Sequence, residues 1–516
     1  MLKRTALLLF FILLKFLIQY QLVDPVYELH RDEFLHLDQA RHLAMGYISV
    51  PPLSACVGWL IGLLGNSEFW IRFFPALFGA LTLLVVWKAM EALKAGLFAL
   101  CLGATCILFS VLLRLNILFQ PNSFDVLAWT FVYYCIIKYI ISNHNKWLWW
   151  AAIGFAIGML NKYNIAFQLL GLLPALLLTS QRVIFTKRSF YYSLTLAFLI
   201  LVPNITWQIQ HGFPVLYHMG ELTKTQLLNV SRADFLKEQL LFFIGSLFVL
   251  IAGFASIFFY RPFKKFTVLP IAFCCTMALF LYLHAKGYYA IGCYPIFIAF
   301  GAVWFEHWTE QRWKKYILRP ILILLPVLIF IPIIEIAFPV KSPAAIVADA
   351  GKQQAMGLHR WEDGKDHPIS QDFADMQGWK ELTAIVDSAY AAIPDKQHTL
   401  VRCDNYGQTG AINYYTSFPG LQALSYNADY IYWFPKNVRW KNIITVKEVN
   451  DSDPDRNDER PYFDSIYLAG RIQNEFAREK GTAVYVMLGA ADTVTGIISK
   501  EVSQLQLSHR STFFKE

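Results

Sequence analysis

Long apolar runs separated by short polar segments dominate the first two-thirds of this chain. A helix needs about 20 apolar residues to cross the hydrocarbon core of a bilayer, and many stretches before residue 338 approach that length. The pattern predicts about eleven transmembrane helices, which form a mainly α-helical bundle. Their expected ranges are 5–23, 70–88, 95–113, 122–141, 147–161, 163–180, 189–207, 239–259, 266–284, 288–305 and 316–337.

After residue 337 the pattern changes to short, alternating helix and strand signals. We expect helices at 378–392 and just before Tyr415, and strands at 399–403, 443–449 and 482–488. The chain therefore divides into a membrane part, residues 1–337, and a small α/β domain, residues 338–516.

The first long loop, residues 24–69, has its own organisation. Apolar residues recur at helical spacing from Glu33 to Tyr47, and Pro51 and Pro52 end that pattern. The apolar stretch from Leu53 to Leu64 is too short to span a bilayer comfortably. We expect two helices that lie at the outer membrane surface.

The two parts of the chain differ in net charge, and the basic residues of the first part predict its orientation in the membrane. Residues 1–337 carry 26 Lys+Arg and 14 Asp+Glu, whereas the rest carry 19 and 23. The pI of about 8.9 therefore belongs to the membrane part and does not indicate nucleic acid binding. Basic residues cluster in alternate short loops, as in cytoplasmic loops. With the N-terminus in the cytoplasm and the first span uncleaved, an odd number of spans places the C-terminal domain in the periplasm or a lumen.

The acidic start of the first long loop is a candidate site. Asp32 and Glu33 are followed by His36 on the expected surface helix. Such residues could deprotonate a hydroxyl, and Glu33 and His36 could hold a divalent cation. A solvated helix face with local ion pairs explains the spacing equally well. No other cofactor is indicated.

Asp125 stands at the outer end of the span that follows Gln120, Pro121 and Asn122. A carboxylate in this place can interact with the N-terminal dipole of a helix. It can also face a site at the depth of Asp32. The pattern alone slightly favours the capping interpretation.

Cationic side chains recur at the outer ends of other spans. Lys162, Lys286, Arg72 and Arg114 are the cations, and His211 lies at a further outer end. Long basic side chains often reach the lipid headgroups from such positions. Together they could instead form a positive pocket for a phosphate. Spacing alone therefore indicates an outward-facing polar site, in either a transporter or an enzyme that uses a lipid.

Several segments, in their order along the chain, resemble one family. The chain is similar to bacterial relatives of the dolichyl-phosphate-mannose–protein mannosyltransferases, which are glycosyltransferases of the GT-C fold akin to the lipid A aminoarabinose transferase. The matching segments are Asp32–Arg41 with Gly46–Leu53, Gln120–Asp125 with Trp129, Leu160–Tyr163, Leu201–Asn204 with Trp207 and Gln210–Pro214, Lys286–Tyr289 with Tyr294 and Pro295, and Tyr406–Ala411.

The resemblance implies a multi-pass enzyme of the inner membrane that moves a sugar from a polyprenyl-phosphate carrier to a lipid, glycan or protein acceptor on the outer side. It implies that Asp32 is the base, that Glu33 positions the acceptor or a metal, and that Asp125 is a second candidate acid. The residues it suggests for the substrate are Lys162, His211, Lys286 and Tyr289, and Arg72 is a further candidate because it is a cation at an outer span end.

The chain departs from the family pattern at two positions beside the lysines. Asn161 stands where many relatives have threonine, and Gly287 stands where many have an acid. The alternative function is a transporter or flippase of polyprenyl-linked sugars. Such proteins often contain inverted repeats and broken helices at the bilayer midplane, and neither is evident here.

Overall fold

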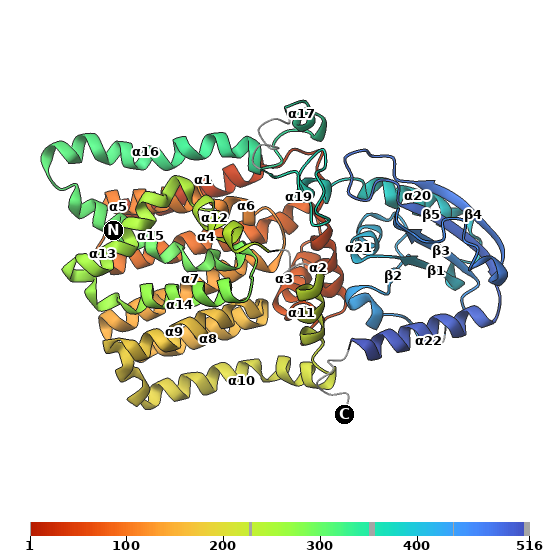
Figure 1. Cartoon of the computed structure of the whole chain (residues 1–516), viewed down its shortest axis with the longest axis horizontal. Helices are drawn as coiled ribbons and strands as arrows, with labels where there is room; N and C mark the ends of the chain where they lie inside the picture. Colours follow the sequence, from red (N-terminus) through yellow and green to blue (C-terminus); the bar gives the residue numbers. More distant parts are fainter. Residues whose placement is uncertain (1, 226–229, 350–356, 437, 510–516) are drawn as a thin grey trace.

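Apolar helices run side by side along the long axis of the molecule and form one bundle (Figure 1). The computed structural model describes residues 2–225, 230–349, 357–436 and 438–509. The bundle helices are α1 (Leu2–Gln21), α4 (Glu68–Ala92), α5 (Leu97–Leu108), α7 (Pro121–Ser142), α8 (Lys146–Asn161), α9 (Ala166–Leu178), α10 (Arg188–Gln210), α13 (Leu247–Phe259), α14 (Val268–Tyr282), α15 (Pro295–Trp308) and α16 (Arg312–Ala337). The predicted mainly helical bundle is confirmed.

Each predicted span coincides with one of these helices or with a bent pair of helical segments. Within the described residues, four helices are by themselves long and apolar enough to cross a membrane, and the number rises to seven if each bent pair counts as one span. The bent pairs lie at 163–186, 232–259 and 287–308. The count of eleven spans stays a prediction.

Polar contacts at one end of the bundle connect loops that carry many of its basic residues. Arg4 donates to the Ala95 carbonyl at 2.9 Å, and Lys187 donates to Asn143 Oδ1 at 2.6 Å. The chain begins at this end, whereas the C-terminal domain lies at the opposite end (Figure 1).

The C-terminal domain is a small α/β domain, as predicted, and helices cover both faces of its sheet. Its sheet has the order β2-β1-β3-β5-β4, in which β1 is parallel to β2 and β3, and β5 is antiparallel to β3 and β4. The strands are β1 (Thr399–Cys403), β2 (Ala423–Ser425), β3 (Asn442–Lys447), β4 (Phe463–Arg471) and β5 (Ala483–Ala490). Of these, β2 and β4 were not predicted.

Side chains alternate between the two faces of this sheet. Val401 and Ile444 pack with helices α20 (Trp379–Ala392) and α21 (Tyr406–Tyr415). The neighbouring residues Leu400 and Ile443 pack with α22 (Thr493–Ser508), a helix that was not predicted. The period of two along each strand thus creates two apolar layers around one sheet.

Several shorter helices complete the structure outside the long bundle helices and the sheet. They are α2 (Arg31–Arg41), α3 (Leu53–Leu63), α6 (Val111–Leu115), α11 (Pro214–Thr225), α12 (Arg232–Leu241), α17 (Pro343–Ala348) and α19 (Gln371–Ala374). In Figure 1, α2 and α3 lie between the bundle and the sheet. Phe34 and Leu37 of α2 share an apolar core with Trp379 and Leu382 of the C-terminal domain.

Candidate active site

Helix α2 begins with a capping box, which fixes the position of the acidic pair. The His30 ring accepts a hydrogen bond from the Asp32 N–H at 3.2 Å, and Glu33 Oε2 accepts one from the His30 N–H at 2.8 Å. All residues from 33 to 40 are buried. The C-terminal domain covers the face of α2 that would otherwise meet solvent, and the position of α2 at the membrane surface stays a prediction.

Glu33 uses both carboxylate oxygens on backbone groups. Its second oxygen accepts a hydrogen bond from the Phe119 N–H at 2.7 Å, which joins α2 to the segment before α7. The side chain is fully enclosed, and burial raises its pKa despite these two hydrogen bonds. In this arrangement Glu33 holds the start of α2 in place.

Asp32, its neighbour, is the accessible member of the pair. Its side chain is 37% exposed. Oδ1 accepts a hydrogen bond from the Tyr406 hydroxyl at 2.7 Å, and Oδ2 accepts one from Gln120 Nε2 at 2.9 Å. Burial raises the pKa of Asp32, but His30, Arg31 and the Tyr406 hydroxyl outweigh burial and hold the pKa below its ordinary value. Asp32 is therefore ionised at neutral pH.

A chain of hydrogen bonds leads from Asp32 to a lysine. Gln120 Oε1 accepts from Asn122 Nδ2 at 2.9 Å, and Asn122 Oδ1 accepts from Lys162 Nζ at 2.7 Å. The Lys162 ammonium lies 4.6 Å from the centre of the Tyr289 ring. The face of an aromatic ring attracts an ammonium group and takes the place of part of its hydration shell. The structure thus connects the predicted base to a predicted phosphate ligand.

Asp125 is buried beside this chain and does not cap its helix. The N-cap of α7 is Gln120. The two Asp125 oxygens accept hydrogen bonds from Trp129 Nε1 at 3.1 Å and from Asn164 Nδ2 at 2.9 Å. Asn164 also donates to the Tyr289 carbonyl at 3.0 Å. The capping interpretation is wrong, and Asp125 instead fixes the segments around Lys162.

Lys286 faces the same region from another segment. Its ammonium lies 3.6 Å from Glu362 Oε1, which belongs to the loop that follows α17. Both Asp32 and Glu362 act electrostatically on the neighbouring Tyr288. A side chain at Gly287 would collide with the Glu238 carboxylate of α12. A carboxylate from another helix therefore fills the place that the family pattern gives to an acid at 287.

The remaining predicted site residues have other recorded contacts. Arg72 pairs with Glu68 at 3.9 Å. The His211 ring stacks on Trp207 with centroids 4.1 Å apart, and the buried His36 ring lies 2.9 Å from Gln39 Oε1. No three His, Cys, Asp or Glu side chains among the described residues gather as a metal site would require.

A second carboxylate on α2 binds the C-terminal domain. The buried Asp38 accepts hydrogen bonds from Asn413 Nδ2 and the Tyr430 hydroxyl, both at 2.7 Å. One residue on, Gln39 donates to Asp429 Oδ2 at 2.7 Å. Burial raises the pKa of Asp38 and of Asp429 to about 6.

Two glycines bring α21 against α2. A Cβ at Gly410 would lie 2.5 Å from Phe34 Cβ, and one at Gly407 would lie 3.2 Å from Arg31 Cβ. Both distances are shorter than ordinary van der Waals contact, so only glycine permits this approach without a shift. The approach places Tyr406 against Asp32, which explains the Tyr406–Ala411 motif.

Sequence reasoning missed Gln120 and Tyr406 as neighbours of Asp32. Both residues stood in segments that resemble the family, but Tyr406 follows Asp32 by more than 370 residues. Nothing local in the sequence connects the two. Their presence in family-like segments was the one available signal.

The chain is similar to known proteins in both sequence and fold. The family model for dolichyl-phosphate-mannose-protein mannosyltransferase matches residues 49–207. A lipid A galacturonosyltransferase, RgtD, of Rhizobium johnstonii is 24% identical over 208 residues, which are 39% of this chain and 42% of that protein. The alignment thus covers less than half the length of this relative.

Solved structures extend the likeness to nearly the whole chain. ArnT from Cupriavidus metallidurans in the apo state superimposes with a TM-score of 0.65 over 93% of this chain and 98% of that one, at 13% identity. The chain has the GT-C fold. ArnT bound to undecaprenyl phosphate gives a TM-score of 0.60 with the same coverage, at 14% identity. The resemblance to GT-C glycosyltransferases, and the fold predicted from it, are confirmed.

Proposed function

We propose that this GT-C protein transfers a sugar from a polyprenyl-phosphate carrier to a hydroxyl group of an acceptor. The arrangement around Asp32 carries the proposal. A partly exposed, ionised carboxylate faces a region in which Lys162 and Lys286 supply positive charge. The name of one solved relative, ArnT bound to undecaprenyl phosphate, supports a carrier of this class.

The proposed reaction is one displacement at the anomeric carbon of the donor sugar. The acceptor oxygen forms the new bond while the bond to the carrier phosphate breaks, and Asp32 takes the hydroxyl proton. The carrier phosphate leaves with the bonding electrons. Lys162 and Lys286 stabilise its growing negative charge, so the leaving group needs no proton. A single displacement inverts the configuration of the sugar.

The other acids of the site are less available for proton transfer. Glu33 accepts two backbone hydrogen bonds, and Asp125 accepts one from Trp129 and one from Asn164. Both side chains are at most 5% exposed. We therefore assign the base to Asp32, and we assign Glu33 and Asp125 to holding the surrounding segments.

We place the protein in the inner membrane, with the N-terminus in the cytoplasm and the C-terminal domain in the periplasm. The basic loops support this orientation, as do the opposite positions of the N-terminus and the C-terminal domain (Figure 1). Cysteines introduced beside Asn427 should react with impermeant reagents from outside, and those beside Lys187 from inside. Reaction of both from the same side contradicts the topology.

The test of function uses purified protein in detergent and radiolabelled polyprenyl-phosphate sugars. The panel contains a neutral hexose, a uronic acid and an amino sugar, each offered with lipid, glycan and peptide acceptors. Transfer of label with release of polyprenyl phosphate supports the proposal. A protein that only moves lipid-linked sugars across a bilayer would show no transfer in detergent. Absence of transfer with every combination of donor and acceptor would therefore contradict the proposed function.

Lys286→Ala tests the role of the lysine within this assay. A contact that is equal in the ground and transition states raises the KM for the donor more than it lowers kcat. Lys224→Ala is the matched control, because Lys224 is an exposed lysine paired with Glu221. Unchanged donor kinetics in Lys286→Ala and in Lys162→Ala would show that neither lysine binds the donor phosphate.

A further inference from the structure

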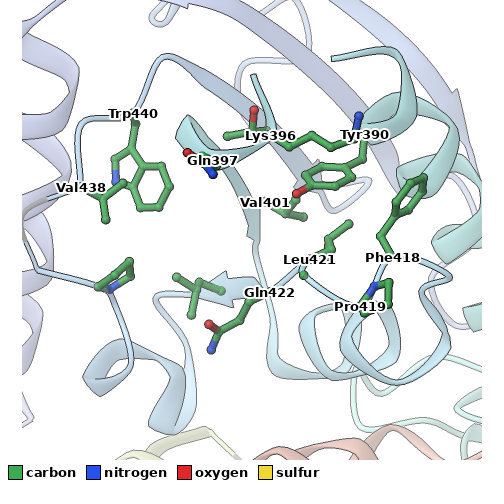
Figure 2. Close-up of a pocket in the computed structure, with 14 residues that line it drawn as sticks. Tyr390, Lys396, Gln397, Val401, Phe418, Pro419, Leu421, Gln422, Val438 and Trp440 are labelled. Atoms are coloured by element: carbon green, nitrogen blue, oxygen red, sulfur yellow. The ribbon is translucent and has the colours of Figure 1, made fainter. Parts of the chain in front are cut away.

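The C-terminal domain contains a cavity of about 490 Å³ that is separate from Asp32. It lies where β1, β2 and β3 begin, and Thr399, Leu424 and Trp440 are among the residues that line it (Figure 2). Tyr406, which contacts Asp32, instead follows the carboxyl end of β1. The length of β1 separates the two places by roughly 16 Å, because a strand rises about 3.3 Å per residue.

The lining combines aromatic rings with side-chain amides. Tyr390, Phe418 and Trp440 supply rings, and Gln397 and Gln422 supply amides. In Figure 2 the two amides lie on opposite sides of the cavity, and Trp440 and Phe418 lie at its two ends. Ligand pockets of 300–1,000 Å³ commonly have this composition, with apolar walls and a few polar groups that fix orientation.

The charge of the lining points to a neutral ligand. Of the residues around the cavity, Lys396 alone is charged. Its ammonium donates to the carbonyls of Ile393 and Ala391, at 3.2 and 3.4 Å, at the end of α20. It lies 5.6 Å from the centre of the Tyr390 ring. The lysine is thus engaged within the protein, and no carboxylate in the lining would attract a cation.

We propose that this cavity binds a neutral sugar unit. The apolar face of a pyranose ring fits against an aromatic side chain, and its hydroxyl groups both donate and accept. Each glutamine amide also does both, since it carries two N–H donors and one carbonyl acceptor. Gln397 and Gln422 are both exposed at the cavity and can reach such a ligand.

The position of the cavity suggests which molecule supplies the sugar. Gln422 Nε2 lies 3.4 Å from Nε2 of His42, the residue that follows α2. Asp32 lies near the other end of α2, roughly 15 Å away at about 1.5 Å per residue. An oligosaccharide acceptor longer than this distance could hold one sugar unit in the cavity and bring a hydroxyl near its other end to Asp32. This assignment to the acceptor rests on the proposed function, whereas sugar binding by the cavity does not.

The test measures binding of neutral trisaccharides to the purified full-length protein in detergent, without donor. The probes are maltotriose, cellotriose, mannotriose and chitotriose, followed by saturation-transfer NMR. We expect saturable binding of at least one of them. Gln397→Ala should weaken this binding about three- to tenfold, the range for one lost hydrogen bond. Gln473→Ala, an exposed glutamine on another side of the domain, is the matched control.

A second variant fills the cavity instead of removing a contact. Gly420 lines the cavity, and a Cβ there meets no atom within 4 Å. Gly420→Trp should abolish trisaccharide binding, whereas Gly496→Trp, at an equally open position on α22, should retain it. Binding must also survive Asp32→Asn, because the two sites are separate.

Three results would overturn the proposal. They are no binding of any trisaccharide, binding that persists in both Gln397→Ala and Gly420→Trp, and binding that Asp32→Asn abolishes. The proposed reaction is judged separately. If Gly420→Trp still releases polyprenyl phosphate at the normal rate while trisaccharide binding is lost, the cavity is a binding site and the reaction stands.

Discussion

The two halves of α2 each present a carboxylate to the C-terminal domain, but the two carboxylates differ in exposure and in the direction of their pKa shifts. In the first half, Asp32 is 37% exposed and its partners include a hydrogen-bond chain that ends at Lys162. In the second half, Asp38 is enclosed by Asn413 and Tyr430. Burial dominates the pKa of Asp38 and raises it, whereas neighbouring cations and a hydroxyl lower that of Asp32.

The comparison indicates that solvent access and neighbouring groups, rather than the presence of a carboxylate, distinguish a residue suited to proton transfer from one that holds two parts of the protein together. Both carboxylates accept a short hydrogen bond from a tyrosine of the same domain. Of the two, Asp32 alone is partly exposed to a substrate hydroxyl and connected by hydrogen bonds to a lysine. We therefore expect changes in the first half of α2 to alter turnover, and changes in the second half to alter stability.

The largest effect should come from Asp32→Asn. The amide keeps the shape of the side chain but cannot accept the acceptor proton, so sugar transfer should fall by roughly 10²–10⁴-fold. Thermal melting and membrane insertion should be unchanged. Asp125→Asn is the comparison, since that residue is assigned to positioning. Near-normal transfer by Asp32→Asn, together with a folded but inactive Asp125→Asn, would reverse the assignment of the base.

Asp38→Ala should act on stability. It leaves the Asn413 amide and the Tyr430 hydroxyl without their buried acceptor, at a cost of about 1–3 kcal/mol. Transfer per folded molecule should change little. Loss of turnover without a change in melting temperature would place Asp38 in the catalytic site instead.

The contribution of the second half of α2 to stability should depend on pH. Because burial raises the folded-state pKa of Asp38 and Asp429 to about 6, the folded protein binds more protons than the unfolded chain between about pH 4 and 6. Their contribution to stability is therefore present below pH 4 and is lost as the pH rises through 6. The melting temperature of Asp38→Asn should vary less over this interval than that of the wild type, and an equal slope would contradict this.

Tyr406→Phe, a change beside Asp32 in the first half of α2, should lower sugar transfer less than Asp32→Asn does. It removes the hydroxyl that hydrogen-bonds to Asp32 Oδ1 and helps to lower its pKa. We expect transfer to fall about tenfold, within the range for a hydrogen bond to a charged group, and the acidic limb of the pH–rate profile to move to higher pH. Tyr414→Phe, on the same helix, should leave the profile in place. A lower rate without that move would indicate a purely structural role.

The smallest effect should come from Glu362→Gln. The Glu362 carboxylate pairs with the Lys286 ammonium, so a donor phosphate must compete with this carboxylate for the lysine. An exposed pair contributes about 0–1 kcal/mol, so the KM for the donor should fall by up to about fivefold at an unchanged kcat. Glu335→Gln, which breaks the pair with Lys341, is the matched control. A higher KM would show that Glu362 helps to bind the donor.

Much of the fold could be predicted from the sequence, because hydropathy directly reports burial in a bilayer. Every predicted span corresponds to helical structure. The strands that were predicted, β1, β3 and β5, are the ones that are mostly buried. The edge strand β4 is largely exposed, so its residues carry a weak signal. The three residues of β2 are too few to form a periodic pattern.

The site could be predicted only in part. The acids and lysines were found because charge beside a membrane is costly and therefore conspicuous. Their division of labour was predicted from the family resemblance alone, since Asp32 and Glu33 are adjacent and chemically alike. What separates them is the Phe119 N–H on one and the Tyr406 hydroxyl on the other. Both partners come from distant parts of the chain, and no local pattern encodes such contacts.

The close packing of α21 on α2 also bears on how the protein is made. Arg31 and Phe34 emerge from the ribosome early, whereas Gly407 and Gly410, against which they pack, follow nearly 400 residues later. Contacts between segments so distant in sequence form late in folding. The nascent chain must therefore complete its bundle and deliver the final domain to the same side of the membrane before Tyr406 reaches Asp32. Synthesis itself thus delays completion of the site, and a chain shortened before α21 would lack it.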